Sequence, residues 1–148
     1  MSQAFVPALV VMFLTVSSPA QAWEFSDTPV CTLVHEEGDA AVRITYDPRA
    51  PEPYAIAVTR GASWPAGPVF AMRFEGGASR TIFTERHRLS PDGRAVGVSD
   101  TGFGNLLDGL EFNARVTALL DDSATGFSLA GAAEPVRRFR ACATAPAV

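Results

Sequence analysis

The stretches VRITY (residues 42–46), YAIAVT (54–59) and FAMRFE (70–75) decide the fold of this chain. In each stretch, large apolar residues alternate with small or polar ones. A period of two is typical of a β-strand that buries one face and turns the other toward solvent. A chain built mainly from such stretches forms antiparallel sheets, and the pattern therefore predicts a β-rich domain.

Further strand candidates follow the same rule, and turn residues separate them. The additional candidates are residues 81–89, 95–100, 115–120 and 126–129. The tripeptides EGD (37–39), EGG (75–77) and PDG (91–93) are typical of hairpin turns. The sequence therefore predicts about seven or eight strands, most of them antiparallel neighbours.

Two segments near the C-terminus follow a helical period instead. The first has leucines at positions 106, 107 and 110 on one face, and Asn105 is expected to cap it. The residues that share a face of the second are Ala132, Val136, Phe139 and Cys142. This helix should begin close to Glu134, because Pro135 is tolerated only in the first turn. The predicted fold class is α+β, mainly antiparallel sheet with two short helices near the C-terminus.

The first 22 residues have the pattern of an export signal. Residues 4–16 carry no charge, and the polar, helix-breaking residues 17–19 precede the small-x-small motif AQA (20–22) that signal peptidases cleave. The uncharged run is shorter than the about 20 apolar residues that span a membrane. We therefore predict a signal peptide over residues 1–22, a single domain over residues 23–148, no transmembrane segment after cleavage, and a periplasmic or secreted location.

The two cysteines lie near opposite ends of the predicted mature chain. Two cysteines in an oxidising compartment usually pair, and the chain has no C-x-x-C motif typical of redox proteins. We therefore predict a disulfide between Cys31 and Cys142. In the chain-entropy treatment, a loop of this length stabilises the fold by about 4 to 5 kcal/mol.

Composition excludes several function classes. All 12 basic residues are arginines, which excludes Schiff-base catalysis and a P-loop because both need a lysine. A net charge of −4 argues against a nucleic-acid partner. His35, His87 and the scattered carboxylates show no spacing typical of metal ligands. The sequence therefore predicts neither a metal nor a cofactor.

The triplet Asp100-Thr101-Gly102 occurs in aspartic proteases, which set two such loops face to face so that two carboxylates share one proton. In this chain Ser99 stands where a hydrophobic residue is usual, and Phe103 stands where a small residue supports the loop. A glycine-rich turn that leaves a strand and enters a helix accounts for the same residues. We therefore predict no catalytic residue, and we expect Asp100 to be a turn residue.

Four side chains are candidate ligand contacts. If the strand at 81–89 is regular beyond Thr84, Arg86 and Arg88 lie side by side near Arg94. Guanidinium groups bind carboxylates or phosphates in a bidentate way, and this hairpin is then an anion-contacting face. The alternative is an ordinary solvated face that nearby acids compensate. Trp64, in a loop, either caps the open end of the core or contacts a partner.

The last third of the chain resembles a known family. A leucine-rich helix at 105–110 precedes a strand that ends in an acidic turn, and FSLAGA (127–132) then leads into a helix ending at Cys142. This order resembles small exported proteobacterial proteins of the invasion-associated locus B type and their uncharacterised relatives. The resemblance implies an antiparallel sheet with two helices and a periplasmic or surface location, and it carries over no catalytic residue. Some such relatives are labelled as an excinuclease subunit, a function that needs the P-loop missing here.

Three function classes remain. We expect an exported, non-enzymatic binding or interaction domain whose partner is an unknown envelope protein or an anionic ligand. The alternatives are a small hydrolase with a site assembled from separated residues, and a structural accessory subunit of an envelope complex. A pocket with paired carboxylates or a His–carboxylate pair would favour the hydrolase. An exposed apolar patch of several hundred Å² would favour a partner surface.

Overall fold

The computed structural model describes residues 4, 10–12, 14 and 22–145. Within these residues the chain forms ten strands and two helices. The strands are β1 (Glu24–Ser26), β2 (Cys31–Glu37), β3 (Ala40–Tyr46), β4 (Tyr54–Thr59), β5 (Phe70–Glu75), β6 (Arg80–Thr84), β7 (Arg88–Leu89), β8 (Ala95–Asp100), β9 (Arg115–Leu120) and β10 (Ser123–Ser128). The helices are α1 (Gly104–Glu111) and α2 (Ala133–Thr144). The α+β class is confirmed, and the strand number is slightly higher than predicted.

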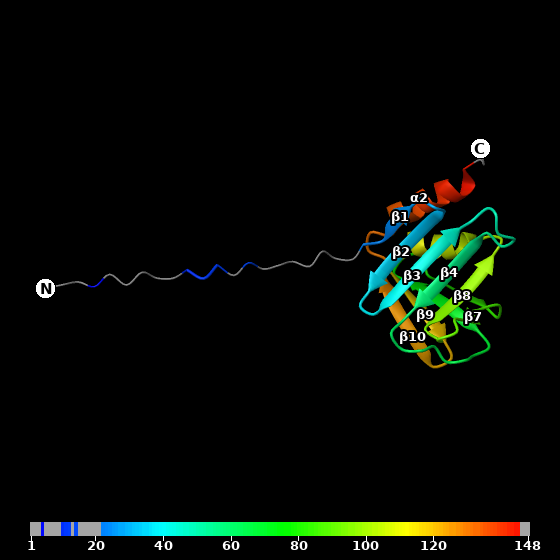
Figure 1. Cartoon of the computed structure of the whole chain (residues 1–148), viewed down its shortest axis with the longest axis horizontal. Helices are drawn as coiled ribbons and strands as arrows, with labels where there is room; N and C mark the ends of the chain where they lie inside the picture. The colour runs from blue at the N-terminus through cyan, green and yellow to red at the C-terminus, as the bar shows by residue number, and fades with distance from the viewer. Residues whose placement is uncertain (1–3, 5–9, 13, 15–21, 146–148) are drawn as a thin grey trace.

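The strands form two antiparallel sheets. The six-stranded sheet has the order β1-β2-β3-β4-β8-β7, and the four-stranded sheet has the order β10-β9-β5-β6. Figure 1 shows the six-stranded sheet toward the viewer, β9 and β10 behind it, and α2 beside β1. The helix α2 packs against β1, β2 and α1. The sheets and α1 therefore enclose one core.

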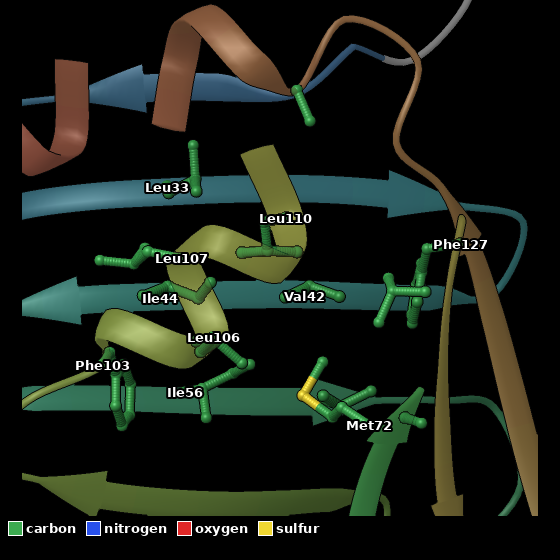
Figure 2. Packing of buried hydrophobic residues seen from close by; sticks show 14 of the residues in the cluster. Leu33, Val42, Ile44, Ile56, Met72, Phe103, Leu106, Leu107, Leu110 and Phe127 are labelled. Carbon is green, nitrogen blue, oxygen red and sulfur yellow. The ribbon is translucent and has the colours of Figure 1, made fainter. Parts of the chain in front are cut away.

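The alternating residues of the sequence form this core. Those that turn inward from β3, β4 and β5 are Val42, Ile44, Ile56, Val58, Phe70, Met72 and Phe74, and all are buried. In Figure 2, α1 lies over β2, β3 and β4, and its Leu106 and Leu107 belong to the same buried cluster as Ile44 and Ile56. Because the buried positions have a period of two, the predicted strand faces are confirmed for these three strands.

The strand predicted at residues 81–89 is wrong in its extent. β6 ends at Thr84 and pairs with β5, whereas β7 pairs with β8 in the other sheet. Residues 85–87 cross from one sheet to the other. The Thr84 hydroxyl accepts a hydrogen bond from the Arg86 backbone N–H at 3.0 Å, a local turn that competes with further strand pairing. Arg86 and Arg88 therefore do not share a strand face.

The sequence predicted the start of α2 correctly but not the residue that caps α1. α1 begins at Gly104 with Phe103 at the N-cap position and no side-chain cap. The prediction that Asn105 caps this helix is wrong, because its side-chain oxygen accepts a hydrogen bond from Arg80 instead. The start of α2 lies where it was predicted, with Pro135 in its first turn. Val136 and Phe139 lie in the core, as the helical spacing predicted.

The predicted disulfide is present. Cys31 and Cys142 are bonded, with their Cα atoms 6.0 Å apart and a sequence separation of 111. The bond joins the start of β2 to the last turn of α2 and so fixes this helix against the six-stranded sheet. Within the described residues, no helix is long and apolar enough to cross a membrane. Most of the predicted signal peptide lies outside the described residues.

Candidate functional site

A cleft of about 550 Å³ opens where an edge of each sheet meets the start of α1. We call it the sheet-edge cleft. Its apolar lining includes Ile56, Phe70, Met72, Val98, Phe103 and Leu106. Its polar lining includes Thr84, Arg86, Asp100, Asn105 and Asp108. Its volume lies within the range of about 300 to 1,000 Å³ typical of ligand sites.

Two strand edges border the cleft. β6 is the last strand of the four-stranded sheet, and β5 is its neighbour. On the other side, β7 pairs with β8 at Val96 and Gly97 and extends no further along it. The final residues of β8, from Val98 to Asp100, therefore continue beyond the end of β7. Strand pairing in both sheets ends at the cleft, because the chain between β6 and β7 crosses from one sheet to the other.

The floor of the cleft is the surface of the core. Phe70 and Met72 of β5, Ile56 of β4 and Leu106 of α1 are buried residues whose side chains reach it. Their positions follow from strand alternation, which turns every second side chain inward. Ile82 and Val98 pack on the core but are only partly buried. An apolar ligand in the cleft would contact side chains from both sheets and the helix.

Charged side chains face one another across the rim. The Arg86 guanidinium donates to the Asp100 carboxylate at 2.9 Å and to Glu52 at 3.3 Å. At the other end of β6, Arg80 lies 3.9 Å from the Asp108 carboxylate. In both pairs the arginine belongs to β6 or the residues directly after it. The arginines therefore lie on the β6 side and the aspartates on the side of β8 and α1. Glu52 also pairs with Arg86, and Arg140 donates to Asp108 at 2.6 Å, so these charges are compensated within the protein.

Asp100 is held in its ionised form. The Thr101 backbone N–H donates to Oδ1 of Asp100 at 2.7 Å, and this bond is the main cause of a lowered pKa. The Arg86 guanidinium lowers the pKa further. Asp100 ends β8, and the residues after it lead directly into α1. In an aspartic protease, each catalytic aspartate shares a proton with a second carboxylate. Asp100 is instead bonded to the Thr101 N–H and paired with Arg86, which fits the interpretation of the triplet as a turn.

The structure brings two of the four predicted contact residues together, because Arg86 and Arg88 line one hollow of about 800 Å³ beside Glu52 and Glu85. Arg94 and Trp64 lie outside that hollow. Arg86 lines the cleft, where two carboxylates already neutralise its charge. Arg88 lies on β7 and Arg94 precedes β8, and both are exposed. Trp64 is 3% exposed and donates its indole N–H to the Val58 carbonyl at 3.1 Å. It caps the core and leaves no surface of its ring for a partner.

A buried histidine lies in a different part of the fold, at the end of β2. His35 is 4% exposed and stacks on Trp23, with ring centres 4.6 Å apart. Its Nε2 atom is 3.5 Å from Oε1 of Glu37, which accepts a hydrogen bond from the Ser128 N–H. Neither ring nitrogen has a hydrogen-bond partner within the described part of the chain.

Sequence reasoning missed this His–carboxylate pair, although the signal was present. Residues two apart on a strand have side chains on the same face of the sheet. Strand alternation alone therefore predicts that the His35 and Glu37 side chains of β2 lie close together. Trp23 covers one face of the imidazole, and the edge-on ring of Phe127 lies 6.2 Å away. His35 and Glu37 both line a hollow of about 400 Å³, so a pocket with a His–carboxylate pair is present. A catalytic base must reach its substrate, however, and only 4% of this histidine is exposed. The packing fits a core aromatic better than a catalytic histidine.

His87 occupies a third environment. Its Nε2 atom lies 2.9 Å from the Gly67 carbonyl oxygen, and its ring packs 6.2 Å from that of Phe70. His87 therefore helps to hold the segment that crosses between the sheets. Across residues 4, 10–12, 14 and 22–145, no group of three or more His, Cys, Asp or Glu side chains is placed to hold a metal ion.

Comparison with known proteins gives no relative for this chain. No family model, no curated protein and no solved structure matches it. The functional argument therefore rests on the geometry and chemistry of the sheet-edge cleft.

Proposed function

We propose that this protein is an exported, non-enzymatic binding domain that holds the apolar part of a ligand in the sheet-edge cleft. The observation that carries the proposal is the apolar floor, where core side chains such as Phe70, Met72 and Leu106 line an opening at the surface. Covering about 100 Å² of apolar surface in the cleft and a similar area of the ligand contributes about 5 kcal/mol before the costs of association. The cleft is thus suited to modest affinity for an apolar group.

The polar groups of the rim support binding over catalysis. Arg86 pairs with Asp100, and Asp108 pairs with Arg80 and, more closely, with Arg140, so these side chains are held in fixed orientations. The described lining contains no histidine, cysteine or lysine that could act as a nucleophile or base. A few fixed polar groups around an apolar floor are the usual composition of a ligand site, where they set the orientation of the ligand.

Export is part of the same proposal. The disulfide between Cys31 and Cys142 supports a periplasmic or secreted location, because such bonds persist in oxidising compartments. The signal-like pattern of residues 1–22 supports the same location. The order of α1, β9, β10 and α2 matches the order on which the resemblance to the invasion-associated locus B type rests. Membership of that group stays a proposal.

An arginine-centred site for anions has weaker support. The carboxylates of Glu52 and Asp100 neutralise Arg86, so an anion would have to displace them. The proposal therefore places the main contacts of the ligand on the apolar floor. Arg86 then contributes by orienting a polar end of the ligand.

A neutral apolar fluorophore tests the proposal. N-phenyl-1-naphthylamine should bind the purified protein saturably at a single site, with a rise in fluorescence. Val98→Trp places a large ring on the wall of the cleft and should weaken the binding at least tenfold. Thr45→Trp is the matched control, since it adds the same ring to β3 on the face opposite the buried Ile44. It should leave the affinity unchanged.

Thermal unfolding and far-UV circular dichroism of both variants show whether each is folded. The proposal fails if the wild-type protein binds no fluorophore saturably. It also fails if a folded Val98→Trp variant binds as tightly as the Thr45→Trp control.

A further inference from the structure

We propose that the ligand of the sheet-edge cleft is an extended polypeptide segment that pairs with β6 as an added strand. The inference rests on the proposed function and names the chemical class of the partner. It depends on three features of β6: its backbone lines the cleft, its outer edge has no neighbouring strand, and charges of both signs border it.

The backbone of β6 faces the cleft. Three consecutive residues at its end, Ile82, Phe83 and Thr84, line the cleft. An adjoining hollow is lined by the consecutive residues 78–82 and shares Ile82 and Asn105 with the cleft. Side chains of a strand alternate between its two faces, so neighbouring residues can all line one hollow only through the strand edge. The groove therefore follows the edge of residues 78–84.

This edge is open. β6 is the outermost strand of the four-stranded sheet and pairs with β5 through residues 70–74. In a strand of this kind, every second residue turns its N–H and C=O toward the unpaired side. Natural edge strands are usually blunted by lysine, proline or a bulge. The sequence of β6, RTIFT, has no proline, and its one charged residue, Arg80, stands at the start of the strand.

A large apolar side chain marks the same edge. Phe83 is 76% exposed and lies on the face of the four-stranded sheet that points away from the core. Ile82, next to it, turns toward the core and the cleft. A segment added beside β6 would cover Ile82 on one face and Phe83 on the other. The apolar surface on both faces of the edge favours strand addition over a ligand that fills only the cleft.

The charges favour a peptide that carries both signs. Arg80 and Arg86 stand near the two ends of β6, and Asp108 and Asp100 face them. These charges are already paired, Arg86 with Glu52 and Asp100, and Asp108 with Arg140. A peptide with an apolar middle and one acidic and one basic flanking residue can exchange with both partners of such a pair, whereas a ligand of one sign leaves one partner uncompensated. A polyanion would meet the two aspartates, and a lipid chain would leave the backbone groups of the edge unpaired. Since a strand rises about 3.3 Å per residue, about five residues of the partner would cover β6.

A second copy of this chain fits the groove less well. The β6 strand of a second copy also lies in a groove bordered by α1 and β8. Pairing the two β6 strands would therefore bring α1 and β8 of one copy against those of the other. A single extended segment has no such second wall. The geometry therefore points to a flexible or terminal segment of a partner protein.

Selection from a phage-displayed library of random dodecapeptides tests the inference with the purified, disulfide-bonded protein. The peptides that bind best are synthesised, and each of their amide nitrogens is methylated in turn. Only alternate amides of an added strand face β6, so methylation should weaken binding at least tenfold at every second position and less than twofold between. Hydrogen exchange should slow at amides within residues 80–84 when the peptide is bound.

Competition with N-phenyl-1-naphthylamine separates the inference from the proposed function. A peptide that displaces the fluorophore without a period of two in its methylation profile overturns strand addition and leaves the cleft as a binding site. If the library yields no peptide that binds better to the wild-type protein than to the Val98→Trp variant, strand addition is also overturned. A dimer by light scattering with slowed exchange in β6 would show that a second copy occupies the edge, against the inference.

Discussion

Removing the disulfide should lower the stability of the fold by an amount that the structure sets. The bond between Cys31 and Cys142 closes a loop with a sequence separation of 111, nearly the whole described domain. Chain-entropy theory gives about 16 cal/mol/K for a loop of this size, or about 5 kcal/mol at 25 °C. Proteins of this size are commonly stable by about 5 to 15 kcal/mol, so the loss is a large share of the total.

The double variant Cys31→Ala plus Cys142→Ala measures this loss without leaving a reactive thiol. With an unfolding entropy of about 2.1 cal/mol/K per residue, a domain of this length should lose about 15 to 20 °C in Tm. Thermal unfolding by circular dichroism gives the two Tm values. Adding a reductant is the control, because it should lower the Tm of the wild-type protein toward that of the variant and leave the variant unchanged.

A difference in Tm below about 5 °C would refute the reasoning, since it would mean that the unfolded chain gains little freedom when the bond is absent. A variant in which α2 stays packed against the sheet at all temperatures below the transition would agree with the chain-entropy explanation. The two cysteines would then act through the unfolded state rather than by holding the helix in place.

Three further variants test the packing and charges of the fold. Gly109→Ala should lower the free energy of unfolding by about 1 to 3 kcal/mol, because a Cβ atom there would lie 2.6 Å from ring carbons of the buried Phe74. Urea unfolding measures this loss. A gain in stability would contradict the packing of α1. Asp100→Asn should lower stability at pH 7 by less than about 1 kcal/mol, because its ion pair is partly exposed. Since folding lowers the pKa of Asp100, its contribution is present above the unfolded value of about 3.9 and is lost as pH falls through the folded value. The stabilities of the variant and the wild type should therefore converge in acid. His35→Phe should stay within about 1.5 kcal/mol of the wild type, whereas His35→Ala should cost about 2 to 4 kcal/mol, because the ring acts by packing on Trp23; equal losses in both variants would argue for a polar role.

Local patterns predicted the parts of the fold that depend on one buried face. The period of two in β3, β4 and β5 located these strands and their inward residues, because each strand has one face in the core. The disulfide followed from the placement of two cysteines in a chain with a predicted export signal. The start of α2 followed from the rigid backbone of Pro135.

The candidate site depends on features that no single stretch contains. The strand predicted at 81–89 is divided because a hydroxyl–backbone bond at Thr84 ends β6 and the chain then changes sheets. The cleft forms where residues 85–87 cross between the sheets, because no described strand fills the space between the edge of β6 and the end of β8. Its lining comes from β4, β5, β6, β8 and α1, and their meeting is a property of the tertiary fold. Arg86 was selected for its charge, but the structure gives it a place at the rim of an apolar site.

Methyl NMR of the protein titrated with N-phenyl-1-naphthylamine tests the central claim that the sheet-edge cleft is the ligand site. The account predicts that the shifts change first at methyl groups of the floor and walls, namely Ile56, Met72, Ile82, Val98 and Leu106. Methyl groups of Leu33 and Val42, which lie in the core and do not line the cleft, should keep their positions. Saturable shifts confined to any other face of the protein, with the cleft methyl groups unchanged, would contradict the account.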